Sequence, residues 1–162
     1  MALVRILVDG YSLLHAWPEL APGKPRFSEA AREELVAILR LYMDAEGTPV
    51  TVIFDGRGTG RGHGRVRRKP VQRAQEIEVI YSNAGQTADQ LIERAAHRFQ
   101  PYGEVLAVTD DLAERETVLS LGGMASSCWN FMQTVENALA EVSDHIKHHN
   151  RQERHQFQRR KI

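Results

Sequence analysis

The chain has 162 residues, of which 42% are hydrophobic and 26% charged, a composition typical of one folded domain. Its 21 Lys and Arg residues balance its 21 Asp and Glu residues, so the overall charge does not indicate a partner. A single cysteine, Cys128, excludes an intramolecular disulfide and a cysteine-based zinc cluster. The sequence shows neither an apolar run of the roughly 20 residues that span a membrane nor a signal-type segment, so we expect a cytoplasmic protein.

Short runs rich in Val and Ile alternate with stretches whose apolar residues recur at helical spacing. The predicted elements are, in chain order, strand Leu3–Val8, helix Ser28–Ala45, strand Val50–Phe54, strand Ile77–Tyr81, helix Thr87–Phe99, strand Val105–Thr109, helix Leu112–Leu121, a short strand Met124–Cys128 and helix Phe131–Ile146. This alternation predicts an α/β fold with a central parallel sheet flanked by helices on both faces. We expect one domain over residues 1–146 and a basic helical extension or tail over residues 147–162.

The segment 56–75 contains no acidic residue and is typical of a basic loop. Its basic residues are Arg57, Arg61, Arg65, Arg67, Arg68, Lys69 and Arg73. Because the charge is all of one sign, we favour contact with nucleic acid over a solvated loop without function. The second basic run, residues 147–161, is most simply a solvated helix end, with contact to RNA or the ribosome as the alternative.

Acidic residues follow the predicted strands. Asp9 comes directly after the first strand, Asp55 after the second, and Asp110 and Asp111 after the fourth. Asp89 lies in the first turn of the helix that follows the third strand. Because open α/β sheets bind ligands beyond the carboxyl ends of their strands, we expect these side chains to meet at one edge of the sheet.

One aspartate at a strand end is more often a helix cap than a metal ligand. Several converging carboxylates repel one another, however, and Mg²⁺ or Mn²⁺ commonly stabilises such a group. Glu93 lies one turn beyond Asp89 and is a further candidate ligand. Arg94 and Arg115 could instead neutralise the acids, which would make the cluster structural. A metal site of this kind activates water for attack on a phosphodiester bond, and no competing HExxH or GxSxG motif is present.

Four stretches of the chain together resemble the YacP-like branch of the NYN domains, which are relatives of the PIN nucleases. They are ILVDGYSLLHAWPEL, VTVIFDG, IEVIYSNAGQTADQLIERAA and VLAVTDDLAERETVLSLGG. The resemblance spans roughly residues 3–140, and its most specific parts are the VDGY and TADxxI elements. It implies a PIN-like Rossmannoid fold and a metal-dependent endoribonuclease of single-stranded RNA, linked in this branch to ribosome-associated mRNA decay.

The resemblance also implies which residues act. The acids that match the family's catalytic and metal-binding positions are Asp9, Asp55, Asp89 and Asp111, with Asp110 and Glu93 as additional metal ligands. Ser12 stands where the family usually has Asn, so a hydroxyl replaces an amide beside the metal. This departure favours one alternative, a non-catalytic RNA- or ribosome-binding module with the same fold. Tyr11 and Trp17 could stack on a base, although their positions are more typical of core residues.

Overall fold

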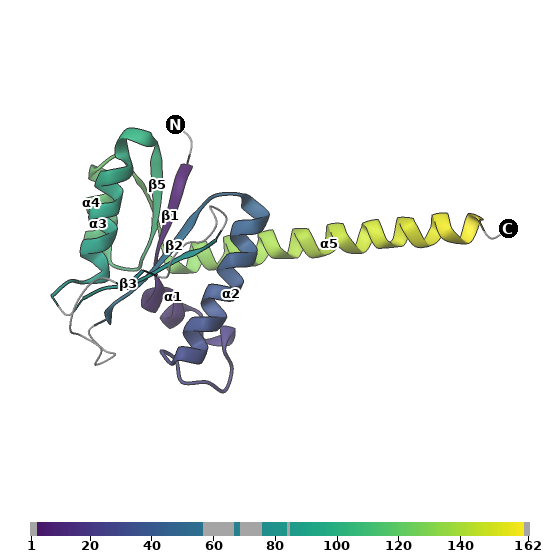
Figure 1. The fold of residues 1–162 in the computed structure, drawn as a ribbon, viewed down its shortest axis with the longest axis horizontal. Coiled ribbons are helices and arrows are strands. Elements are labelled where there is room, and N and C mark those ends of the chain that lie inside the picture. Colours follow the sequence, from purple (N-terminus) through teal and green to yellow (C-terminus); the bar gives the residue numbers. More distant parts are fainter. Residues whose placement is uncertain (1–2, 57–66, 69–75, 84, 161–162) are drawn as a thin grey trace.

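The computed structural model describes residues 3–56, 67–68, 76–83 and 85–160 and confirms the predicted α/β fold (Figure 1). The elements are β1 (Leu3–Asp9), α1 (Gly10–Ala16), η1 (Pro18–Leu20), α2 (Glu29–Glu46), β2 (Val50–Phe54), β3 (Arg67–Arg68), β4 (Glu78–Tyr81), α3 (Ala88–Phe99), η3 (Gln100–Tyr102), β5 (Glu104–Val108), α4 (Leu112–Ser120), β6 (Met124–Ser126) and α5 (Cys128–Arg160). The strands form one sheet in the order β3-β4-β2-β1-β5-β6. All neighbouring pairs are parallel except β3 with β4.

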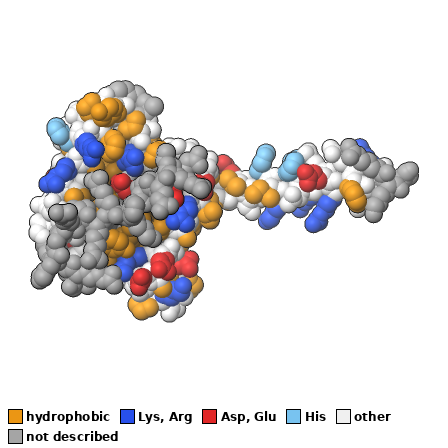
Figure 2. Space-filling view, in the orientation of Figure 1, with side chains coloured by type: hydrophobic (Ala, Val, Ile, Leu, Met, Phe, Trp, Pro, Cys, Tyr) orange, Lys and Arg blue, Asp and Glu red, His pale blue; other side chains and the backbone are white. Residues whose placement is uncertain are grey.

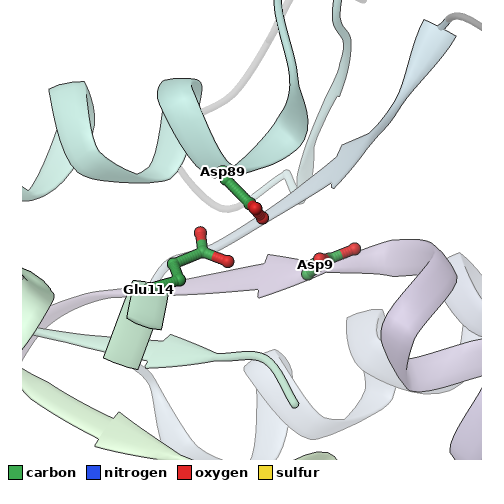
Figure 3. A group of neighbouring side chains, drawn as sticks. All are labelled: Asp9, Asp89 and Glu114. Atoms are coloured by element: carbon green, nitrogen blue, oxygen red, sulfur yellow. The ribbon is translucent and has the colours of Figure 1, made fainter. Parts of the chain in front are cut away.

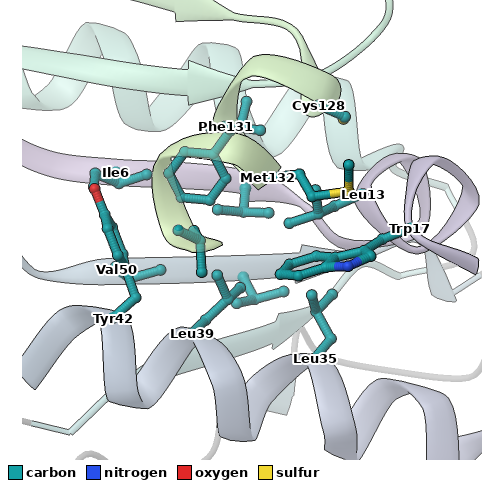
Figure 4. Packing of buried hydrophobic residues seen from close by; sticks show 14 of the residues in the cluster. Ile6, Leu13, Trp17, Leu35, Leu39, Tyr42, Val50, Cys128, Phe131 and Met132 are labelled. Atoms are coloured by element: carbon teal, nitrogen blue, oxygen red, sulfur yellow. The ribbon is translucent and has the colours of Figure 1, made fainter. Parts of the chain in front are cut away.

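Helices cover both faces of the sheet, as the Val- and Ile-rich strands predict. Ile6 and Val8 of β1 point into one core, which contains residues of α1, α2 and the start of α5 (Figure 4). Leu7 points to the opposite face, where it packs with residues of α3 and α4. Alternate residues of the central strand therefore fill two separate cores, and this double burial holds β1 rigidly in the middle of the sheet.

The direction of the chain across the sheet reverses between β1 and β5. From β1 the chain adds β2 and β4 on one side, and it then returns to add β5 and β6 on the other side. In open α/β sheets such a reversal opens a crevice beyond the carboxyl ends of the two central strands. Asp9 ends β1 at this place, and the segment from Thr109 to α4 begins there after β5.

Two elements differ from the sequence prediction. Helix α1 was not predicted, because it follows β1 without any loop and spans only seven residues. Helix α5 is longer than predicted and runs from Cys128 to Arg160. Its first turns pack in the core, whereas every residue from Glu141 to Arg159 is exposed.

The exposed part of α5 projects from the body of the molecule (Figure 1). Figure 2 shows its Lys and Arg side chains mostly along the lower side and its His side chains along the upper side. The division into a domain ending at residue 146 and a basic extension stays a prediction, since α5 runs through this boundary without a break. Within the described residues, no helix combines the length and the apolarity that crossing a lipid bilayer requires.

Candidate metal centre

Three carboxylates meet at the crevice between β1 and β5. They belong to Asp9 at the end of β1, Asp89 in the first turn of α3 and Glu114 in the first turn of α4. One oxygen atom from each lies within 4.8 Å of the other two, and Figure 3 shows the three side chains gathered at one place. Three elements that are far apart in the sequence therefore deliver acids to one point, the arrangement that hard divalent cations favour.

Asp9 combines the roles of helix cap and member of the acidic group. Its carboxylate accepts hydrogen bonds from the backbone N–H of Ser12 at 3.3 Å and from the Ser12 hydroxyl at 3.1 Å. Gly10 allows the direct passage from strand to helix, because a Cβ atom there would lie 2.3 Å from the ring of Phe54. Burial raises the pKa of Asp9, the two Ser12 hydrogen bonds oppose this rise, and the charge of Asp89 adds to it.

A capping box holds the start of α3 and with it Asp89. The backbone N–H of Gln90 donates to Thr87 Oγ1 at 3.1 Å, and the backbone N–H of Thr87 donates to Gln90 Oε1 at 3.1 Å. Asp89 lies between these two residues in the chain and is partly buried. A carboxylate in the first turn of a helix is also favoured by the helix dipole.

Glu114 is the member of the group that the sequence did not reveal. Its side chain is only 2% exposed, and within the described residues neither carboxylate oxygen has a hydrogen-bond partner. Burial, followed by the neighbouring Asp89, raises the pKa of Glu114 to about 9. A buried carboxylate without donors is costly unless a proton or a cation accompanies it.

One signal in the sequence could have identified Glu114. Counting along α4, Glu114 lies four residues before Val118 and seven before Leu121, so the three share the face that packs on the sheet. Glu114 thus takes a position where helical spacing calls for an apolar residue. The acids predicted as ligands lie instead at strand ends or in the first two turns of α3.

The other predicted acids have different surroundings and lie outside this group of three. Asp111 is exposed and caps α4, where its Oδ1 accepts from the backbone N–H groups of Ala113 at 3.0 Å and Glu114 at 3.3 Å. Asp110 is also exposed, and its Oδ1 accepts from the backbone N–H of Cys128 at 2.9 Å at the start of α5. These two aspartates therefore fix the starts of the helices beside the site.

Asp55 and Glu93 are the remaining predicted acids, and Asp55 interacts with the group through its charge. Asp55 is partly buried, accepts a hydrogen bond from Ser82 Oγ at 3.3 Å, and its charge contributes to the raised pKa of Asp9. Glu93 is partly buried on α3, one turn after Asp89. No ion pair joins Arg94 or Arg115 to an acid within the part of the chain that the structure describes, so the alternative of acids neutralised by arginine finds no support there.

The remaining predicted residues lie in the core, in strand β3 or in segments that the structure does not describe. Trp17 is buried in the core (Figure 4), as its position in the sequence indicated. Arg67 and Arg68 form β3, which pairs with Tyr81 and Ile80 of β4. The other basic residues of the predicted loop lie outside the described residues, namely Arg57, Arg61, Arg65, Lys69 and Arg73.

Comparison with known proteins gives consistent matches over nearly the whole chain. The family model described as the YacP-like NYN domain matches residues 6–162. Uncharacterized protein YacP of Bacillus subtilis is 27% identical over 143 residues, which span 88% of this chain and 81% of the relative. A crystal structure of a mutant of Rae1 (YacP) from Bacillus subtilis superposes with a TM-score of 0.72 at 25% identity and covers 90% of this chain and 82% of Rae1. A second Rae1 crystal structure, at 24% identity and a TM-score of 0.68, covers 91% of this chain and 80% of its own, and it supports the likeness in fold.

Proposed function

This chain belongs to the YacP-like NYN domain family, as its motifs indicated, and we propose that it is a metal-dependent endoribonuclease. Its substrate would be single-stranded RNA, and its products would carry a 5′-phosphate and a 3′-hydroxyl. The observation that carries this proposal is the group formed by Asp9, Asp89 and Glu114 at the crevice of the sheet. Following the resemblance of its motifs to the YacP-like branch, we propose that the activity serves ribosome-linked mRNA decay in the cytoplasm.

The residues of the site fit a hard divalent cation. The donor set consists of carboxylate oxygens, which Mg²⁺ and Mn²⁺ prefer over nitrogen or sulfur ligands. The two oxygens of Glu114 are buried without hydrogen-bond partners among the described residues, and a cation would satisfy them. Asp9, Asp89 and Glu114 would hold the ion directly, while Asp55, Asp110, Asp111 and Glu93 would act through water molecules or through the backbone.

When bound, the ion would polarise the phosphate and activate the attacking water. The protein's own residues prepare the site for this step. Ser12 donates two hydrogen bonds to Asp9, which orient the carboxylate toward the crevice. This is a role that a hydroxyl fills as well as an amide, so Ser12 in place of Asn is compatible with an enzyme. Asp111 holds the first turn of α4, from which Glu114 projects.

The test is cleavage of an end-labelled single-stranded RNA by the purified protein in Mn²⁺ or Mg²⁺, with EDTA as the control. We expect cleavage that depends on the metal and is lost in Asp9→Asn with Asp89→Asn, while the double variant still folds and binds RNA. The same reactions are run with translating ribosomes, because the ribosome-linked part of the proposal requires cleavage there. Binding without cleavage under both conditions would contradict the enzyme and leave the RNA-binding module.

A further inference from the structure

One arginine of α2 has no acidic side chain that neutralises it in the described part of the chain. Arg32, in the first turn of α2, is partly buried, and its Nη1 donates to the Tyr11 hydroxyl at 3.2 Å and to the backbone carbonyl of Phe27 at 3.1 Å. Within the described residues no carboxylate forms an ion pair with it. The segments outside the description contain no Asp or Glu, so they supply no acidic side chain either. The guanidinium charge therefore has no acidic side chain as its counter-ion.

The aromatic residues that hold Arg32 are direct neighbours, in the chain, of residues at the metal centre. Tyr11 precedes Ser12, the hydrogen-bond donor to Asp9, and Tyr81 precedes Ser82, the donor to Asp55. The Arg32 guanidinium lies 5.9 Å from the centre of the Tyr81 ring, within the range of a cation–π contact. Arg32 is thus positioned at the same carboxyl edge of the sheet as the acidic group.

The aromatic rings near Arg32 pack against one another in a continuous row. The ring centres of Tyr11 and Phe54 are 5.2 Å apart, and those of Phe54 and Tyr81 are 5.4 Å apart. Phe54 is fully buried and precedes Asp55, so the row of rings is fixed to the core of the protein. At its outer side Phe27 packs edge-on against Tyr11 at 5.4 Å and keeps 46% of its surface exposed. A cation beside exposed aromatic surface suits a single strand, because the cation can bind its phosphates and the aromatic rings can stack on its bases.

From these contacts we propose that Arg32 binds a backbone phosphate of the RNA strand at the same carboxyl edge of the sheet as the metal centre, with Tyr11 and Tyr81 as positioning residues. The inference rests on the proposed function, and it names the residue that holds the substrate. A planar guanidinium presents paired N–H donors that match phosphate oxygens, and the Nη1 bonds to Tyr11 and Phe27 use only part of this donor set. The strand β3, which belongs to the basic segment, pairs with β4 at Tyr81.

The competing explanation is that Arg32 is structural and only ties the carbonyl of Phe27 to α2. The salt dependence of RNA binding separates the two explanations, because each phosphate contact contributes about 0.7 to the slope of log K against log salt concentration for a single strand. A structural arginine would change the stability of the fold but not this slope.

The experiment measures binding of a fluorescently labelled single-stranded RNA in EDTA, over a series of salt concentrations. We expect Arg32→Gln to weaken binding about tenfold at low salt and to reduce the slope by about 0.7. Arg40→Gln is the matched control, since Arg40 is an exposed arginine of the same helix, about 12 Å further along its axis. This control should leave both the affinity and the slope unchanged.

Arg32→Lys keeps the charge but loses the planar donor pair, so it should retain the slope and bind several-fold more weakly. If Arg32→Gln does not fold, as thermal unfolding would show, Arg32→Lys decides the matter, and wild-type affinity in it would overturn the proposal. Wild-type affinity and slope in Arg32→Gln, or no RNA binding by the unaltered protein, would also overturn it. EDTA removes the metal, so this experiment measures RNA binding alone. If binding depends on Arg32 but the protein shows no metal-dependent cleavage, only the proposed nuclease function is refuted.

In steady-state cleavage assays with Mn²⁺, loss of the phosphate contact should raise KM more than it lowers kcat. Unchanged KM with a lower kcat would assign Arg32 to the geometry of the site and overturn substrate binding.

Discussion

The short segment from Thr109 to Glu114 contains acids in two opposite environments. Asp110 and Asp111 are exposed, and backbone N–H groups at the starts of α5 and α4 satisfy their carboxylates. Glu114, three residues later, is buried, has no hydrogen-bond partner within the described residues and faces Asp9 and Asp89. Acids at the same strand end can thus have opposite surroundings, and burial distinguishes Glu114 from its exposed neighbours Asp110 and Asp111.

The largest expected effect is on cleavage. Glu114→Gln removes a negative ligand but keeps the volume and should reduce metal-dependent RNA cleavage at least about 100-fold, more than the loss of an outer-sphere residue. Glu116→Gln, an exposed residue of the same helix, is the control and should retain activity. Equal activity of the two variants, measured at saturating Mn²⁺, would remove Glu114 from the metal centre.

The next effect concerns the stability of the metal-free protein. Glu114 is protonated in the fold up to about pH 9, whereas in the unfolded chain it ionises near pH 4.5. The unfolded state therefore releases a proton in this window, and the free energy of unfolding should fall as pH rises through it. The size is of the order of a few kcal/mol at the alkaline end.

Urea denaturation in EDTA between pH 5 and pH 9 measures this dependence. The difference between the wild-type protein and Glu114→Gln isolates the contribution of Glu114, and the variant should become the more stable of the two as pH rises. Added Mn²⁺ should restore the wild-type protein at high pH, because a ligand that binds the folded state stabilises it. A pH-independent difference between the two proteins would show that the Glu114 carboxyl is not protonated in the fold.

A smaller effect is expected at Asp111. Asn caps a helix about as well as Asp, so Asp111→Asn should keep the stability within about 0.5 kcal/mol. Without its charge near the metal, cleavage should fall about tenfold. Asp111→Ala also removes the cap and should cost about 1 kcal/mol, or about 2–4 °C in Tm. If Asp111→Asn loses as much activity as Glu114→Gln, Asp111 is a direct ligand and the contrast between the two acids disappears.

The smallest effect is expected at Asp110. Its carboxylate accepts from the backbone N–H of Cys128, so Asp110→Ala should lower the free energy of unfolding by about 1 kcal/mol through the start of α5. Cleavage by the folded protein should change less than threefold, on the order of what surface substitutions produce. Thermal unfolding and cleavage rates on the same preparations check this pair of outcomes, and a large loss of activity at unchanged Tm would contradict the capping role.

The sequence predicted the fold well because its information on the strands is local. Runs of Val and Ile such as Val50–Phe54 reflect burial on both faces, and the helical spacing of apolar residues defines α2 and α3. It did not predict α1, since seven residues that follow a strand directly are too few for a periodic pattern. The placement of Asp9 and Asp89 at one edge was predictable, because the ends of parallel strands and the helices that follow them meet there.

What the sequence determined by itself is the α/β order, the family and two of the three acids in the group. Only the tertiary structure decided that Glu114 completes this group and that Arg32 lies at the same carboxyl edge of the sheet. The reason is physical: helical periodicity indicates which residues share a face, but the crossing of the helix over the sheet decides what that face meets. The buried face of α4 brings Glu114 to two other carboxylates, and α2 brings Arg32 to Tyr11 and Tyr81.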